Sequence, residues 1–239
     1  MISVCIPVLN EAENIKSLIA EIKAASEKAP ITEIVVVDDD STDNTIDVIK
    51  SLKPHTPAIK LIAHDKRGGQ SAALRTAIRA ATNPIIVTMD GDGQNDPADI
   101  PALYQKFTQA DPALKMLMIA GQRKKRIDSR LKKFTSRMGN AIRGFLLDDG
   151  IRDTGCSLKL CRRDDYLTLP YFNHMHRYLP ALFLREYGTI LTIDVAHRAR
   201  TAGTSKYGFW DRALVGIYDL IGVIWLMKRK SNNITAKEL

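Results

Sequence analysis

Short runs of β-branched and other apolar residues alternate with helix-length segments along the first 121 residues of the chain. The apolar runs cover residues 2–8, 33–37, 59–63, 85–89 and 115–120. The segments of helical length lie between them, at about residues 11–26, 43–52, 70–81 and 97–109. Because parallel strands need a crossover connection, which a helix usually supplies, this alternation predicts a mostly parallel, doubly wound α/β sheet.

The apolar run at 85–89 ends abruptly in the sequence Asp90-Gly91-Asp92-Gly93-Gln94. Two carboxylates one residue apart at the end of a buried strand repel each other and lose hydration. A hard cation such as Mg²⁺ or Mn²⁺ relieves both effects, and Gln94 offers it a neutral oxygen. Mg²⁺ held by few carboxylates completes its shell with substrate phosphates, so the motif predicts a metal–diphosphate site. A turn rich in Asp and Gly is the alternative that this motif alone leaves open.

The run at 33–37 also leads into carboxylates, which are Asp38, Asp39 and Asp40. Ser41 or Thr42 can cap the following helix, but a cap does not account for three successive acids. Ligands of open α/β sheets bind outside the carboxyl ends of the strands, so we expect both acidic ends to share one site. No Gly-x-Gly-x-x-Gly fingerprint follows the first run, which argues against a nicotinamide or flavin enzyme.

Charge and cysteine usage narrow the class of protein further. The chain has 239 residues, a net charge of +8 and a pI near 9.4, which favours anionic partners such as nucleotides, lipid phosphates or a membrane surface. Its cysteines, Cys5, Cys156 and Cys161, follow no metal-binding spacing and predict no structural disulfide. The first run follows Met1 without a basic or cleavable leader, so a cytoplasmic location is expected.

The regular alternation stops at Gly121, and the next segment is strongly basic. Residues 123–137 contain eight Lys or Arg residues and one Asp. No linker or repeat separates this segment from the residues after it. We therefore expect residues 1–209 to form one domain with two halves, 1–121 and 122–209.

Residues 210–230 differ from the rest of the chain, because between Ala213 and Met227 only Asp219 is charged. As a helix this stretch reaches roughly 22 Å, which is short of the roughly 30 Å of a bilayer core. Its aromatic residues and flanking cations predict an amphipathic helix in the membrane interface, followed by a tail at 231–239. A helix docked on the domain, or in an oligomer contact, is the alternative. We expect a peripheral or monotopic protein on the cytoplasmic face of the cell membrane.

Three N-terminal motifs, at 7–11, 37–43 and 90–94, occur in the order found in family 2 glycosyltransferases of GT-A fold, and the chain resembles that family. More narrowly, it is similar to the polyprenyl-phosphate sugar transferases of the dolichol-phosphate mannosyltransferase type. The narrower resemblance also rests on segments 121–123, 153–156 and 200–207, and it covers nearly the whole chain.

On the donor side, the resemblance implies a nucleotide-sugar half at 1–121. The residues that would line or bind the nucleotide are Pro7, Asn10, Glu11, Asp39 and Asp90, with Asp39 hydrogen-bonded to the base. The residues that would hold Mg²⁺ or Mn²⁺ on the donor diphosphate are Asp90, Asp92 and Gln94. The nucleotide, GDP or UDP, and the sugar both stay open.

On the acceptor side, the resemblance implies that 122–209 receives a polyprenyl phosphate. The residues that would bind the phosphates are Arg123, Lys132, Ser136, Arg200, Ser205 and Lys206. Lys132 stands where the family favours Arg, which weakens a bidentate phosphate contact there. Asp92, Arg123 and Asp153 are the catalytic candidates, with Asp153 placed to orient the sugar or an arginine.

Elementary chemistry supports a phosphate acceptor. A phosphate monoester has a second pKa of about 6, so the nucleophile is already largely ionised at neutral pH and needs no strong general base. We therefore expect direct displacement with inversion at the anomeric carbon. The principal alternative is transfer to a sugar or protein hydroxyl, with Asp153 as the base. A haloacid-dehalogenase-like phosphatase and a basic nucleic-acid-binding module are remote alternatives, and no nucleic-acid partner is expected. A homo-oligomer is compatible with the sequence.

Overall fold

The computed structural model describes residues 1–53, 58–123, 147, 150–198 and 209–229. Its centre is a seven-stranded sheet with the strand order β3-β2-β1-β4-β6-β5-β7. The strands are β1 (Ile2–Val8), β2 (Ile31–Asp38), β3 (Ile59–Ala63), β4 (Ile85–Thr88), β5 (Leu117–Arg123), β6 (Lys159–Arg162) and β7 (Thr189–Val195). The sheet is parallel except at β6, which runs antiparallel to both of its neighbours. This confirms the mostly parallel α/β fold.

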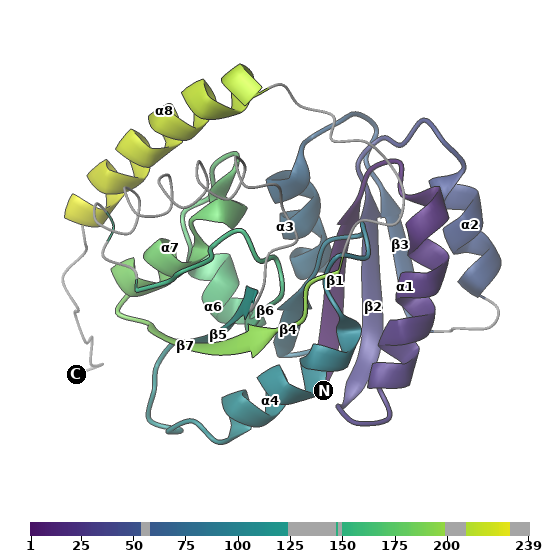
Figure 1. Cartoon of the computed structure of the whole chain (residues 1–239), viewed down its shortest axis with the longest axis horizontal. Helices are drawn as coiled ribbons and strands as arrows, with labels where there is room; N and C mark the ends of the chain where they lie inside the picture. The colour runs from purple at the N-terminus through teal and green to yellow at the C-terminus, as the bar shows by residue number, and fades with distance from the viewer. Residues whose placement is uncertain (54–57, 124–146, 148–149, 199–208, 230–239) are drawn as a thin grey trace, which may run out of the picture.

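Helices cover both faces of the sheet and give three layers (Figure 1). The α-helices are α1 (Ala12–Ala25), α2 (Thr45–Leu52), α3 (Gln70–Ala80), α4 (Ile100–Thr108), α6 (Arg163–Thr168), α7 (Leu179–Arg185) and α8 (Phe209–Lys228). Two short 3-10 helices are η2 (Pro97–Asp99) and η3 (Met175–Arg177). Apolar residues of α1, α2 and α4 belong to one buried cluster, whereas those of α3, α6, α7 and α8 belong to the other.

The strands build both clusters because successive side chains point to opposite faces of a sheet. On β1, for example, Val4 and Ile6 belong to the first cluster and Cys5, between them, belongs to the second. A strand buried on both faces needs a continuous apolar run, and this is the pattern of the central strands.

The sequence patterns placed two elements only approximately. The strand predicted at 115–120 begins later, at Leu117, and continues to Arg123 because its pairing with β7 extends that far. The apolar pattern at about 174–186 predicts a single helix, but the structure has two helices there. His174, with φ 65°, lies before η3, and Tyr178, with φ −115° and ψ 10°, lies between η3 and α7. Because both residues are outside the helical region, no single helix runs through this segment.

Helix α8 lies along the edge of the molecule beside α7 (Figure 1). Several contacts attach it to the domain. His174 Nδ1 lies 2.9 Å from Asp219 Oδ2, and the Tyr178 hydroxyl donates to the Gly216 carbonyl at 3.2 Å. Val223 is fully buried between α8 and the domain. Within the described part of the chain, no helix combines the length and apolar character needed to cross a bilayer.

Candidate active site

Those predicted site residues that the structure describes gather at one edge of the sheet because of the strand directions. β1, β2 and β4 are mutually parallel, so their carboxyl ends meet at this edge. Two successive antiparallel pairings, β4 with β6 and β6 with β5, return β5 to the direction of β4. Arg123 at the end of β5 and Asp153, in the loop before β6, therefore reach the same edge as Asp90.

Asp90 and Asp92 follow β4 in a turn that two glycines make possible. A Cβ on Gly91 would lie 2.7 Å from Val8 Cγ1, so this position packs directly against the end of β1. Gly93 has φ +71°, a conformation that side chains of L-residues disfavour. The backbone amide of Asp90 donates to Ser157 Oγ at 3.1 Å, and the amide of Gln94 donates to Asp92 Oδ1 at 3.1 Å.

The electrostatics of this turn fit a divalent cation. Burial, together with the negative charge of Asp92, raises the pKa of Asp90 to about 6. A cation between the carboxylates would remove this repulsion, and the side chain of Gln94 could add an amide oxygen. In the portion of the chain that the structure describes, no three His, Cys, Asp or Glu residues form a metal-binding group. Such an ion would thus have few protein carboxylates, as Mg²⁺ sites shared with substrate phosphates usually do.

The predicted nucleotide-pocket residues Asn10 and Glu11 connect the end of β1 to the loop after β2. The Asn10 side-chain oxygen accepts from the Thr42 amide at 2.7 Å, and the Asn10 amide donates to Ser41 Oγ at 2.8 Å. The Glu11 amide donates to Thr45 Oγ1 at 2.9 Å. These contacts hold the residues that follow β1 against the acidic end of β2.

Asp39 is buried and organises the loop that leads into α3. Its carboxylate accepts from the backbone amides of Gly68 at 2.8 Å and Gly69 at 2.7 Å. His64 Nδ1 lies 2.8 Å from the same carboxylate, and Thr76 Oγ1 lies 2.9 Å from His64 Nε2. These contacts give Asp39 a structural role, and its predicted hydrogen bond to a base stays a prediction.

Arg123 and Asp153 form a bidentate ion pair. Arg123 Nη2 donates to Asp153 Oδ1 at 2.6 Å, and Nε donates to Oδ2. The side chains are only 13% and 9% exposed. A Cβ on Gly155 would lie 2.9 Å from Arg123 Nη2, so the ion pair packs against this glycine. The catalytic candidate Asp153 therefore has both oxygens committed to a guanidinium.

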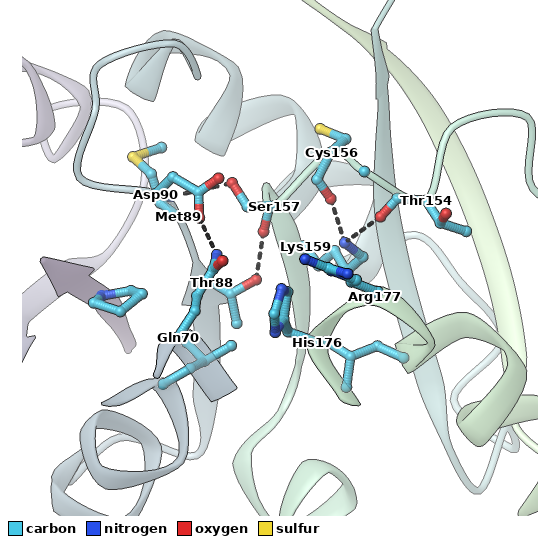
Figure 2. Close-up of a pocket in the computed structure, with 14 residues that line it drawn as sticks. Gln70, Thr88, Met89, Asp90, Thr154, Cys156, Ser157, Lys159, His176 and Arg177 are labelled. Carbon is cyan, nitrogen blue, oxygen red and sulfur yellow. Dashed lines mark hydrogen bonds between the residues drawn. The ribbon is translucent and has the colours of Figure 1, made fainter. Parts of the chain in front are cut away.

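A cavity of about 240 Å³ opens beside Asp90 (Figure 2). Pro7 and Asp90 line it from the strand ends, and Gln70 and Leu74 line it from α3. The loop at 154–157 and η3 close the other sides. Gln70 Nε2 donates to Asp90 Oδ1 at 2.6 Å, which orients the carboxylate at the mouth of the cavity.

Lys159, on β6, lies in the wall of this cavity and is 3% exposed. Its ammonium donates to the Thr154 carbonyl at 3.4 Å and to the Cys156 carbonyl (Figure 2). Burial lowers the pKa of Lys159, although the charges of Cys156, Asp90 and Asp153 act in the opposite direction. The lysine thus holds the loop that carries Asp153 while placing a cation near Asp90.

His176 also lines the cavity, and its Nδ1 lies 2.7 Å from Ser71 Oγ on α3. Burial, with the nearby charges of Arg177 and Lys159, lowers the pKa of His176 to about 3. The imidazole is therefore neutral at physiological pH, so the charged residues of the described cavity wall are Asp90, Lys159 and Arg177.

Five predicted phosphate-binding residues lie outside the described part of the chain: Lys132, Ser136, Arg200, Ser205 and Lys206. Arg200, Ser205 and Lys206 follow Arg198, which is the last described residue before them. The Arg198 amide donates to the Gln94 carbonyl at 3.0 Å, and its guanidinium contacts Asp96 at 2.5 Å and Glu21 at 2.6 Å. The chain at 198 is thus fixed beside the turn that carries Asp92.

Sequence reasoning missed Gln70, Ser157 and Lys159. A lysine inside the apolar sequence Ser157-Leu158-Lys159-Leu160-Cys161 was an available signal, because a charged residue in a central strand needs a partner. Gln70 opens a helix and gave no comparable signal.

The fold and the acidic, cavity-bearing edge are those of a GT-A glycosyltransferase. A family model described as "Glycosyl transferase family 2" matches residues 3–169, and the chain belongs to this family.

Two relatives are lipid-phosphate sugar transferases by name. The chain is 32% identical to the dodecaprenyl-phosphate galacturonate synthase of Rhizobium johnstonii, over 96% of this chain and 68% of that protein. It is 29% identical to the undecaprenyl-phosphate 4-deoxy-4-formamido-L-arabinose transferase of Pectobacterium carotovorum, over 92% of this chain and 66% of that protein. The chain thus spans about two thirds of the length of these relatives.

Solved structures show the same fold at low sequence identity. Glucosyl-3-phosphoglycerate synthase from Mycobacterium tuberculosis, in complex with UDP, superposes with a TM-score of 0.71 at 18% identity, covering 98% of this chain and 82% of that chain. Mannosyl-3-phosphoglycerate synthase from Rubrobacter xylanophilus gives a TM-score of 0.69 at 16% identity, covering 100% of this chain and 78% of that chain. A further structure of the former enzyme contains Mn²⁺ and UDP.

Proposed function

We propose that this glycosyltransferase moves a sugar from a nucleoside diphosphate, GDP or UDP, to a polyprenyl phosphate, with inversion and with a divalent metal. The observation that carries the proposal is the Asp90–Asp92 turn, which is half-buried, carries two mutually repelling carboxylates and opens to a cavity with cationic residues in its wall. The names of the two relatives support a polyprenyl phosphate as acceptor. The Mn²⁺- and UDP-bound neighbour supports a metal-dependent nucleotide-sugar donor.

Mg²⁺ or Mn²⁺ would be held by Asp90, Asp92 and the side chain of Gln94. When bound, the ion would neutralise charge on the leaving diphosphate. The protein orients the Asp90 carboxylate through Gln70 and anchors its backbone through Ser157. These contacts position the ligands before substrate arrives, which is the condition for electrostatic stabilisation without reorganisation.

The surroundings of Asp153 favour a phosphate acceptor over a hydroxyl. A hydroxyl acceptor needs a base, but both oxygens of Asp153 already accept hydrogen bonds from Arg123. An ionised lipid phosphate needs none, because it is already a nucleophile at neutral pH. Arg123 and Lys159 place positive charge near the site, where two phosphate-bearing substrates must meet.

Helix α8 supports membrane association. Its exposed large apolar residues are Ile217 (56%), Tyr218 (76%), Ile221 (61%) and Trp225 (59%). Ile217, Ile221 and Trp225 are four residues apart and form one stripe, opposite the buried Val223. Exposed Lys228 and Arg229 follow, where they would meet anionic headgroups. We place the protein at the cytoplasmic face of the cell membrane as a peripheral or monotopic enzyme.

The test is transfer from radiolabelled GDP- and UDP-sugars to a short-chain polyprenyl phosphate, with Mg²⁺, with Mn²⁺ and with EDTA. We expect metal-dependent label in the organic phase and a loss of at least about 100-fold in Asp92→Asn, the scale of losing one group that stabilises developing charge. Asp47→Asn, on an exposed part of α2, is the control and should keep full activity. If no donor labels the lipid while a nucleotide-sugar still binds with metal, the acceptor is not a lipid phosphate.

A further inference from the structure

We propose that the donor sugar carries a carboxylate, as a uronic acid does, and that Arg177 binds this group within the cavity beside Asp90. The inference rests on the proposed function and adds the chemical class of the sugar. It begins from the size of the cavity. About 240 Å³ is below the roughly 300–1,000 Å³ of pockets that hold drug-sized ligands, so it suits a sugar ring and not a whole nucleotide-sugar.

Arg177 is a cation without a partner among the described residues. Its guanidinium has neither a hydrogen bond nor an ion pair with any residue that the structure describes, although it is half-buried in the cavity wall. The backbone of η3 fixes its position, because the Arg177 amide donates to the His174 carbonyl at 3.0 Å. Figure 2 shows the side chain extending toward the cavity, on the side opposite Asp90. An arginine fork in this setting matches a carboxylate, with which it can form two parallel hydrogen bonds.

Lys159 adds a second positive charge that no described carboxylate pairs with directly. Its ammonium is held by two carbonyl oxygens, which satisfy its hydrogen bonds but carry no net charge. No carboxylate oxygen among the described residues lies within 4.0 Å of it in an ion pair. A buried cation without an anionic partner is costly, and a bound anion in the cavity would relieve that cost.

The charges of the cavity wall favour an anionic sugar over a neutral one. Asp90 is the one carboxylate among the described wall residues, and the proposed metal site would engage it. Lys159 and Arg177 would then face the sugar, and the His176 imidazole in the same wall is neutral. A neutral hexose offers hydroxyl groups that leave both charges uncompensated. The competing role for Arg177 is a contact with the donor diphosphate, which would serve every donor alike.

The experiment compares donors that differ only at C6, where one has a carboxylate and the other a hydroxymethyl group. The pairs are UDP-galacturonate with UDP-galactose, UDP-glucuronate with UDP-glucose, and GDP-mannuronate with GDP-mannose. For the full chain with Mn²⁺, transfer to polyprenyl phosphate gives kcat/KM for each donor. We expect the uronate to exceed its neutral partner by at least about 100-fold in one pair.

Arg177→Gln should remove most of this preference, to below about 10-fold, by lowering kcat/KM for the uronate at least about 10-fold more than for its neutral partner. Arg177→Lys should restore part of the preference, because lysine keeps the positive charge but cannot form two parallel hydrogen bonds with a carboxylate. Arg79→Gln, an exposed arginine on α3, should change nothing. Each preference is a ratio within one enzyme preparation, so it does not depend on the folded fraction.

Preference for a neutral donor would overturn the proposal. An equal loss of kcat/KM for the uronate and its neutral partner in Arg177→Gln would overturn it as well. Donor binding measured by calorimetry with Mn²⁺ separates the two proposals. Tight, Arg177-dependent binding of a uronate donor without lipid labelling would refute the lipid acceptor and uphold the acidic sugar. Lipid labelling from neutral donors alone would do the reverse.

Discussion

The Arg123–Asp153 ion pair allows a sharp test of how the edge of the sheet is held together. Both side chains are less than 15% exposed, and Gly155 leaves just enough room for the pair. Removing one partner of a buried pair leaves an uncompensated charge and typically costs about 3–5 kcal/mol. We expect Asp153→Asn and Arg123→Met each to lose that much stability. For a chain of this size this corresponds to roughly 6–20 °C in melting temperature.

The assay is urea unfolding of the single variants and of the double variant, followed by circular dichroism. The double variant has neither charge, so it should be more stable than the sum of the two losses predicts, by at least about 2 kcal/mol. If each single variant lost less than about 1 kcal/mol in its free energy of unfolding, the usual value for exposed ion pairs, the reasoning would be refuted. Additive losses would do so as well, because they would show that the two side chains do not interact.

Two other predictions concern regions away from the cavity. Burial alone would raise the pKa of Glu33, but hydrogen bonds from Ser3, the Thr82 amide and Lys60 lower it below its ordinary value near 4.5. The ionised form therefore stabilises the fold above about pH 4.5, and this contribution is lost as the pH falls through the lowered pKa. Urea midpoints between pH 6 and pH 3 should fall less steeply in Glu33→Gln, and an unchanged slope would exclude Glu33 as the source. On α8, Ile221→Asp should weaken flotation with anionic vesicles by about 10- to 100-fold, since burying an Ile side chain contributes about 1.5–3 kcal/mol. Tyr171→Asp, at an exposed apolar residue off α8, is the control, and equal flotation of both variants would contradict membrane binding through this face.

Much of the fold could be predicted because local patterns determine it. The central strands β1, β2 and β4 are largely apolar, and such strands with helices between them permit few arrangements other than a parallel sheet. The position of β6 between β4 and β5 could not be predicted. A strand of four residues carries no signal for its partners or its direction, which contacts across the sheet decide.

The site could be predicted where its residues interrupt a pattern. Asp90 and Asp92 stood out because carboxylates follow a buried strand, and the structure places them at the edge where parallel strands end. Lys159 bonds carbonyls three and five residues away, and its charge within an apolar strand was an available signal. Gln70 instead acts through Asp90, which is 20 residues away in the sequence, so its role becomes visible only in three dimensions. The ion pair of Arg123 and Asp153 likewise joins residues 30 positions apart.

The antiparallel strand β6 explains how one edge of the sheet brings both halves of the chain together. If β5 paired directly and antiparallel with β4, Arg123 would leave the sheet at the opposite edge, far from Asp90. With β6 inserted, β5 runs parallel to β4 and the loop before β6 starts at the same edge. This insertion also places Lys159, at the first position of β6, directly opposite Thr88 at the last position of β4. The carboxylates of one half and the cations of the other therefore lie at the same edge of one sheet, which is the arrangement that the proposed transfer between two phosphate-bearing substrates requires.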